Sequence, residues 1–252
     1  MTLLPGSVRN VRRGLRMYGP KWLLSYVIRY QVVAPIMKAC LQSSGSADLV
    51  RLGSDSGGWW VPGFVLRPGA VAYCVGAGDD ISFDLALHDR GLRVVTMDPT
   101  PSAITHVRAA APQGERFTFV PVGLWDKSEE LRFFNPRDSA HVDYSIVNLQ
   151  RTSEYFIGKV KPLRELMDEL GDTKIDILKI DIEGAEHRVI ESFLADGINP
   201  AVVCVEFDQP SALRPILQSV RRLRESRYRL VRVEQWNYTF VKIPSAVSAQ
   251  NR

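Results

Sequence analysis

The sequence has few cysteines, and it has no long apolar run. Three cysteines in 252 residues, without metal-ligand spacing, exclude a disulfide framework and a zinc site. They indicate a reducing compartment, so we expect a cytoplasmic protein that holds no metal. No uninterrupted apolar run approaches the roughly 18 residues that a membrane-spanning helix requires. The start also lacks the small-residue cleavage pattern of a signal peptide.

The amino-terminal segment lacks acidic residues, whereas the rest of the chain is rich in them. Residues 1–47 carry seven basic residues and no Asp or Glu, whereas residues 48–252 carry 25 basic and 28 acidic residues. The net charge of +4 therefore describes a basic helical arm on a mildly acidic body, and we expect a domain boundary between residues 47 and 48. The acidic balance of the body argues against a nucleic-acid partner.

Apolar residues of the arm recur at three- and four-residue steps and predict one amphipathic helix, interrupted near Pro35. Such a helix either packs on the domain, which is the commoner case, or makes peripheral contact with an anionic membrane surface. An Arg-rich, acid-free start is also typical of a mitochondrial presequence, and the sequence leaves that alternative open. The stripe consists of Trp22, Tyr26, Tyr30, Val33, Met37 and Leu41.

From residue 68 onward, strand-like and helix-like segments alternate, which predicts an α/β fold with a doubly wound, mostly parallel sheet. The last two strands are separated by a short turn and predict an antiparallel terminal hairpin. Residues 43–58 are interpreted as a linker, and residues 135–158 as a loop insertion over a site. The expected strands are residues 71–75, 93–97, 117–120, 175–180, 201–207, 228–233 and 236–241, and the expected helices are 80–90, 102–111, 162–170, 184–196 and 211–226.

A glycine loop and an acid follow the first two expected strands. Gly76, Ala77 and Gly78 end the first strand before a helix, where glycines let a ligand approach the backbone and free N–H groups await it. The loop lacks the third glycine of a dinucleotide fingerprint. Asp98 ends the second strand, where a carboxylate accepts hydrogen bonds from ribose hydroxyls. Together they predict a nucleoside cofactor; the alternative is a tight turn and a helix cap.

Carboxylates beside the glycines distinguish between two such cofactors. NAD and S-adenosylmethionine both present a ribose, but the pyrophosphate of NAD disfavours neighbouring carboxylates. Asp79 and Asp80 follow Gly78 directly, which favours S-adenosylmethionine, and Asp80 is a candidate contact to it. Trp125 and Asp126, after the third strand, are candidates for packing on its adenine and for binding its exocyclic amine. An NAD-type oxidoreductase is the alternative.

The fourth expected strand carries three charges near its end. Strand alternation places Lys179, Asp181 and Glu183 on one face, and charges at the end of a buried strand are costly unless they pair or take part in chemistry. Open α/β sheets bind ligands at that end. One alternative is that the two acids cap the next helix while Lys179 neutralises them. Another is that the carboxylates hold a divalent cation.

Residues 176–186 resemble the D-x-L-K-I-D-[VI]-E-G-x-E signature of the FkbM-type methyltransferases. The resemblance covers roughly residues 71–207, including 123–126, Ser145 and Glu206. It implies a class I methyltransferase (Rossmann-like) fold for residues 48–252, S-adenosylmethionine as the cofactor, and O-methylation of a glycan, glycolipid or small natural product. The glycine loop has Cys74 and Gly78 where the family usually has Asp and Asn. A non-catalytic module that binds the cofactor is therefore a further alternative.

Methyl transfer to an alcohol needs alignment of the two reactants and removal of a proton. Asp181 is the first candidate for the base or for the group that orients the acceptor. Glu183, Glu206 and His187 are lesser candidates for the same role. We expect the insertion, which holds His141, Tyr144 and Ser145, to cover the acceptor. The resemblance implies Ser145 alone as a contact to it, and His141 and Tyr144 are equally well interpreted as turn and packing residues. The oligomeric state stays open.

Overall fold

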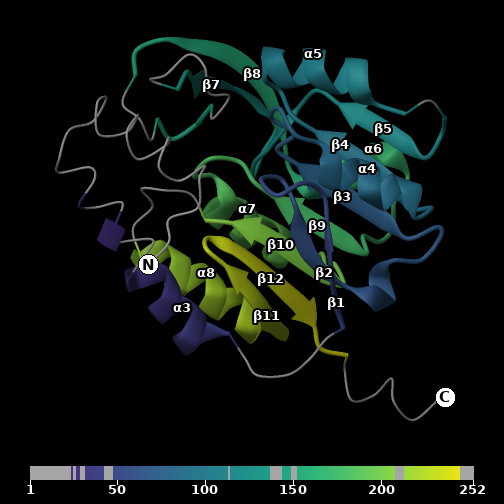
Figure 1. Ribbon diagram of the computed structural model, residues 1–252. Helices are drawn as coiled ribbons and strands as arrows, with labels where there is room; N and C mark the ends of the chain where they lie inside the picture. Colours follow the sequence, from purple (N-terminus) through teal and green to yellow (C-terminus); the bar gives the residue numbers. More distant parts are fainter. Residues whose placement is uncertain are drawn as a thin grey trace.

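The structure is a computed structural model that describes residues 24, 27–28, 32–42, 48–112, 114–136, 144–148, 152–207 and 213–244. Its main element is a seven-stranded sheet (Figure 1). The strands are β3 (Val71–Val75), β4 (Arg93–Met97), β5 (Phe117–Val120), β9 (Ile177–Ile180), β10 (Val202–Glu206), β11 (Tyr228–Glu234) and β12 (Asn237–Lys242). Their order is β11-β12-β10-β9-β3-β4-β5, and β3, β4, β5, β9 and β10 are parallel. β12 is antiparallel to both of its neighbours.

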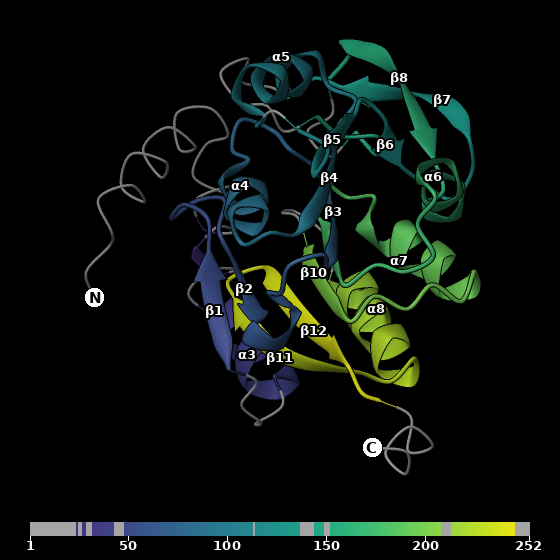
Figure 2. The ribbon, with the colours of Figure 1, turned by 90° about the vertical axis from the view of Figure 1, so that its right-hand side faces the viewer.

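Both faces of this sheet are covered. One face carries α3 (Ala34–Leu41), α6 (Leu163–Leu170), α7 (Glu186–Ala195) and α8 (Leu213–Glu225). The other carries α4 (Ser82–Asp89), α5 (Pro101–Ala110) and the hairpin of β1 (Leu49–Leu52) and β2 (Trp59–Pro62). Figure 2 shows α4 on one side of β3 and β4, with α7 and α8 on the other. Alternate residues of β3 therefore enter two separate cores, and all five are buried.

A second sheet of three strands lies beside α5 in both views (Figure 1) (Figure 2). It consists of β6 (Gly123–Leu124), β7 (Glu129–Phe134) and β8 (Tyr155–Lys161), in the order β6-β8-β7. Phe133 of β7 stacks on Phe156 of β8 with ring centroids 5.1 Å apart. The small sheet thus brings the segment around the expected insertion to the carboxyl end of β4 and β5, where β6 follows β5 along the chain.

The predicted fold class is confirmed: a doubly wound, mostly parallel sheet ends in an antiparallel hairpin. Two local predictions are wrong. Residues 49–52 form β1 in place of a linker, because they pair with Trp59–Pro62. Residues 155–158 begin β8 in place of an irregular loop, because they pair with β7. Both strands depend on partners that their own composition does not reveal.

Of the expected arm helix, the structure describes α3 most fully. Pro35 stands in its first turn, where the missing N–H removes no intrahelical hydrogen bond. Ala34, Met37 and Leu41 are buried in the core, so one side of α3 packs on the domain. Among the residues that the structure describes, no helix is long and apolar enough to cross a membrane.

Candidate active site

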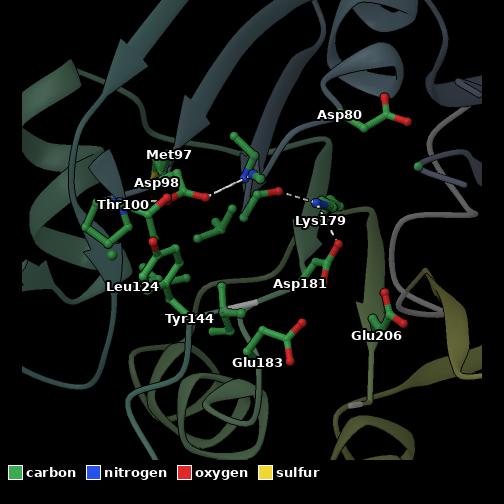
Figure 3. Close-up of a pocket in the computed structure, with 18 of the residues that line it drawn as sticks. Asp80, Met97, Asp98, Thr100, Leu124, Tyr144, Lys179, Asp181, Glu183 and Glu206 are labelled. Carbon is green, nitrogen blue, oxygen red and sulfur yellow. Dashed lines mark hydrogen bonds and ion pairs between the residues drawn. The ribbon is translucent and has the colours of Figure 1, made fainter. Parts of the chain in front are cut away.

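A cavity of about 390 Å³ opens at the carboxyl ends of β3, β4, β9 and β10. This is the edge at which open parallel sheets bind ligands, and the volume lies in the range of small-molecule sites, roughly 300–1,000 Å³. Figure 3 shows Asp181, Glu183 and Glu206 on the side formed by β9 and β10. Asp98, Thr100 and Leu124 lie on the side formed by β4 and β6.

The glycine loop rests directly on the end of β9. Gly76 has φ +88°, and its N–H donates to the carbonyl of Met97 at 2.9 Å. A Cβ at Gly76 would lie 1.7 Å from the carbonyl oxygen of Asp181. Only glycine satisfies both the backbone angle and this approach. The predicted cofactor loop and the predicted catalytic strand are therefore packed backbone to backbone.

Asp98 is buried, with 6% of its surface exposed, and it holds the glycine loop in shape. Its Oδ2 accepts hydrogen bonds from the N–H groups of Ala77 at 2.9 Å and Gly78 at 3.1 Å. Its Oδ1 accepts from the N–H and the hydroxyl of Thr100 at 2.8 and 2.6 Å. These bonds engage about four lone-pair sites, the full capacity of a carboxylate. Asp98 lines the cavity, and its contact to a ribose stays a prediction.

Asp80 ties the β1–β2 turn to the start of α4. Its carboxylate accepts from the hydroxyl of Ser54 at 2.5 Å and from the N–H of Ser82 at 2.9 Å. Burial acts to raise the pKa of Asp80, but these hydrogen bonds outweigh it and hold the pKa below its usual value. A Cβ at Gly57 would lie 2.7 Å from the Asp80 carboxyl carbon. Ser56 and Gly57 consequently line the cavity, although their segment was expected to be a linker.

Lys179 connects the glycine loop with Asp181. It is buried, its Nζ lies 3.1 Å from Oδ2 of Asp181, and it donates a hydrogen bond to the carbonyl of Gly76. Burial alone would lower the pKa of Lys179, but the nearby carboxylates of Asp181 and Asp84 raise it above its usual value. The side chain therefore remains a charged ammonium group at neutral pH.

A buried polar cluster lies behind Lys179, formed by Asp84, Thr96, Cys74 and Cys204. Asp84 of α4 accepts from the hydroxyl of Thr96 at 2.5 Å. Burial raises the pKa of Asp84 to about 6, against the opposing effect of Lys179. Burial also raises the pKa of Cys204 to about 12 and that of Cys74 above its usual range. The sequence interpretation missed Asp84. Its position three residues before Leu87 puts this acid on the apolar face of α4, and that pattern could have revealed it.

The three predicted catalytic acids all line the cavity. The Asp181 side chain is 30% exposed, and Glu183 has a left-handed backbone with φ +54° at the turn into α7. Glu206 ends β10, the neighbour of β9. Seven carboxylate side chains line the cavity, whereas Lys179 is the one basic side chain among its described lining residues. The cavity is therefore strongly acidic.

Ser145 braces the turn that carries Glu183. It is buried, and its hydroxyl donates to the carbonyl of Glu183 at 2.6 Å, while its backbone pairs with Phe134. Ser145 does not line the cavity, but its neighbours Tyr144 and Ile146 do. The insertion thus contributes to the cavity wall through the residues beside the predicted one. His141 lies outside the described residues.

Trp125 and Asp126 were predicted to contact the cofactor, but they do not line the cavity. The N–H of Trp125 donates to the carbonyl of Lys161 at 2.9 Å, which continues β6 away from the cavity. Asp126 accepts from Nε of Arg188 at 2.6 Å, and the same guanidinium lies 5.0 Å from the Trp125 ring. The other oxygen of Asp126, Oδ1, is buried and finds no hydrogen-bond donor in the described part of the chain.

His187 is also absent from the cavity lining. Its Nδ1 lies 2.9 Å from the hydroxyl of Ser219, and its ring stacks on Phe207. Burial lowers the pKa of His187, so the ring is neutral where it packs against α8. Among the described residues, no group of three or more His, Cys, Asp or Glu side chains is arranged to hold a metal ion.

Comparison with models of known protein families assigns this chain to one family. The model of the methyltransferase FkbM domain matches residues 71–230. Similar solved structures include the fibrillarin pre-rRNA processing protein of Methanococcus jannaschii, with 9% identity over 87% of this chain and 77% of that chain, at a TM-score of 0.43. The 1,6-didemethyltoxoflavin-N1-methyltransferase of Burkholderia thailandensis, with bound S-adenosylhomocysteine, has 13% identity over 97% and 92%, at a TM-score of 0.36. No curated protein matches the chain.

Proposed function

The chain belongs to the FkbM methyltransferase domain family and has the class I methyltransferase fold, and on this premise we propose that it uses S-adenosylmethionine to methylate a hydroxyl group. The acceptor we propose is a glycan, a glycolipid or a small natural product. The observation that supports the cofactor is the charge of the cavity, which is lined by seven carboxylates and, among the described residues, one basic side chain, Lys179. S-adenosylmethionine carries a sulfonium and an ammonium group, which this charge attracts, whereas it repels the pyrophosphate of NAD.

The lining residues suit the parts of this cofactor. Met97, Pro99, Leu124 and Phe133 supply apolar surface for an adenine ring. Asp98 is the proposed partner of the ribose, whose hydroxyls would replace part of the four hydrogen bonds that Asp98 accepts within the chain. The acids that follow the glycine loop, Asp79 and Asp80, are the proposed partners of the cationic end. When bound, S-adenosylmethionine supplies the electrophilic methyl group.

Asp181 has the central role in the proposed mechanism. Lys179 holds one oxygen of the Asp181 carboxylate, which fixes its direction at the cavity wall. Asp181 orients the acceptor hydroxyl and takes its proton as the oxygen is methylated, while Glu183 and Glu206 bind neighbouring hydroxyls of the acceptor. Alignment of this kind supplies most of the acceleration in a direct displacement. Ser145 contributes by holding the turn that carries Glu183.

Calorimetric titration with S-adenosylhomocysteine and with NAD tests the cofactor. We expect S-adenosylhomocysteine to bind and NAD not to bind. Gly76→Ala should weaken this binding at least about tenfold, because the new Cβ displaces the glycine loop. Gly171→Ala is the matched control, since Gly171 also has a positive φ but has open space around it. Binding of NAD without S-adenosylhomocysteine would reverse the proposal in favour of an oxidoreductase.

A non-catalytic module is the second candidate, supported by one feature of the glycine loop. Cys74 is fully buried in the cluster behind Lys179, so this position offers no carboxylate to the cavity. A comparison of metabolites between a knockout and the wild type separates the two functions. A methylated compound that disappears in the knockout supports the enzyme and identifies its acceptor. Cofactor binding with no such compound supports the module.

We also propose a cytoplasmic location. Cys40, Cys74 and Cys204 are all free thiols, and Cys40 is exposed, as expected in a reducing compartment. Fractionation of cells that express the full chain tests this location.

A further inference from the structure

The helix α3 is apolar on two opposite sides. Ala34, Met37 and Leu41 are buried in the core. Val32, just before α3, and Ile36, one turn later, are 49% and 55% exposed. Positions four residues apart share one face of a helix, so these two form an outer apolar face opposite to the buried one. The earlier residues Leu24, Val27 and Ile28 are exposed as well.

The outer side of α8 continues this apolar surface. Leu213 and Leu217, again four residues apart, are 39% and 45% exposed. Both helices cover the same face of the main sheet, and the Arg224 guanidinium of α8 donates to the carbonyl of Leu41 at the end of α3. Figure 1 shows α3 and α8 side by side. Their outer sides therefore turn away from the sheet together. We call Val32, Ile36, Leu213, Leu217 and the basic residues beside them the α3–α8 face.

The charge of the α3–α8 face is basic. Lys38, Arg214 and Arg221 are exposed on the two helices, and Glu225 pairs with Arg221. In the sequence, residues 1–47, which include α3, contain seven basic residues and no acid. Aliphatic side chains among basic ones are typical of a surface that inserts between anionic headgroups. A second copy of this chain would bring like charges together across a two-fold interface.

We propose that the α3–α8 face docks on an anionic lipid bilayer. Val32, Ile36, Leu213 and Leu217 enter the headgroup region, while Lys38 and Arg214 bind lipid phosphates. The docking leaves the cavity unaffected, because no residue of the face lines it. The proposal is independent of the proposed function, since a binding module with this face would dock equally well.

Co-sedimentation of the full chain with vesicles tests the docking. The probe vesicles are phosphatidylcholine with phosphatidylglycerol, compared with phosphatidylcholine alone, at low and at high salt. We expect binding to the anionic vesicles at low salt and a large loss of binding at high salt or without phosphatidylglycerol. The doubly substituted Val32→Ser/Ile36→Ser chain should bind about tenfold more weakly, because two aliphatic side chains no longer enter the headgroup region.

Ile157→Ser is the matched control, because Ile157 on β8 is 54% exposed, nearly the same as Ile36. It should bind the vesicles as the wild type does. The second variant, Lys38→Glu/Arg214→Glu, keeps all the apolar side chains of the face. It should no longer bind the anionic vesicles at low salt, because the charge that attracts the lipid phosphates is reversed. Failure of the wild type to bind anionic vesicles overturns the proposal. So does a wild-type dimer that the Val32→Ser/Ile36→Ser substitution converts to a monomer, since a second copy then covers the face.

Discussion

The two ends of the main sheet use the same residue types in opposite ways. At the amino end, Asp176 accepts from Arg67 at 2.7 Å and from the N–H of Val71 at 2.8 Å. Asp172 accepts from Arg93 at 2.5 Å and from the hydroxyl of Tyr73 at 2.6 Å. These two acids each have an arginine partner. At the carboxyl end, the described lining of the cavity holds seven carboxylate side chains and one lysine.

The comparison shows how structural and functional charges differ in one small domain. Balanced pairs hold elements together and leave nothing for a ligand. An excess of one sign is costly in the free protein, and the proposed cofactor, which is cationic, would compensate for it. β9 joins both situations, because Asp176 precedes it at the balanced end and Asp181 follows it at the acidic end.

Asp181→Asn should have the largest effect. The amide keeps the shape of the side chain but cannot take the acceptor proton, so we expect turnover to fall roughly 10²- to 10⁴-fold. Affinity for S-adenosylhomocysteine should change little. Initial rates on the acceptor, with calorimetry for the cofactor, measure both. Asp176→Asn, in the same signature but at the balanced end, is the control and should retain turnover. Unchanged turnover in Asp181→Asn would remove Asp181 from its role.

Lys179→Met should have the second largest effect, on stability. It leaves Asp84 and Asp181 without their ammonium partner, and breaking a buried ion pair costs about 3–5 kcal/mol. The free energy of unfolding from urea titration measures this loss. The double variant Asp84→Asn/Lys179→Met should recover part of it, because the buried acid is then neutral. If Lys179→Met lowers the free energy of unfolding no more than the same substitution of an exposed lysine does, the ion pair of Lys179 with Asp181 does not stabilise the fold.

Asp84→Asn should alter the pH dependence of stability. The folded pKa of Asp84 is about 6 against an ordinary value of 3.8, so the folded state keeps a proton that the unfolded state has released. The contribution of Asp84 to the free energy of unfolding therefore falls as pH rises from about 4 to 6. In Asp84→Asn this fall, roughly 3 kcal/mol for a shift of about two pKa units, should be absent. Asp168→Asn, at an exposed position of α6, should keep it. Parallel curves for Asp84→Asn and the wild type would contradict the shift.

Arg67→Met should have the smallest effect and tests the balanced end. The Arg67 side chain is 54% exposed, so its pair with Asp176 is partly screened and its loss should cost about 1 kcal/mol. Affinity for S-adenosylhomocysteine should equal that of the wild type. Urea unfolding and calorimetry measure the two quantities. Loss of cofactor affinity in this variant would show that the two ends are coupled, and the comparison would no longer hold.

Much of the fold was predictable, because apolar periodicity is local. The ranges predicted for β3, β4 and β5 agree with the structure, and the terminal hairpin is in place. The strands outside the main sheet, β1, β2, β6, β7 and β8, were missed. Leu49–Leu52 and Tyr155–Lys161, for example, become strands only through pairing with β2 and β7. Periodicity along the chain does not report a pairing partner.

The location of the candidate site was predictable from the sequence, but the contacts of its single residues were not. Alternation and parallel topology bring the glycine loop, Asp98 and Asp181 to one edge, and the cavity is there. The roles of single residues within the signature were not predictable. Asp176 pairs at the far end of β9, and Oε1 of Glu186 accepts from the N–H of Gly184 at 2.8 Å and holds the turn. Neighbours in sequence have different surroundings once a strand runs through the core.

The sequence by itself determined a doubly wound sheet, an acidic body with a basic arm, and an acid-rich edge beside a glycine loop. It did so because hydrophobic period and charge are properties of neighbouring residues. Only the tertiary structure decided which charges pair. The bond from Ser54 to Asp80 and that from Lys179 to Gly76 join residues 26 and 103 positions apart. Hydrogen bonds between distant segments arise from packing, and they made Asp84 and the β1–β2 turn part of the site.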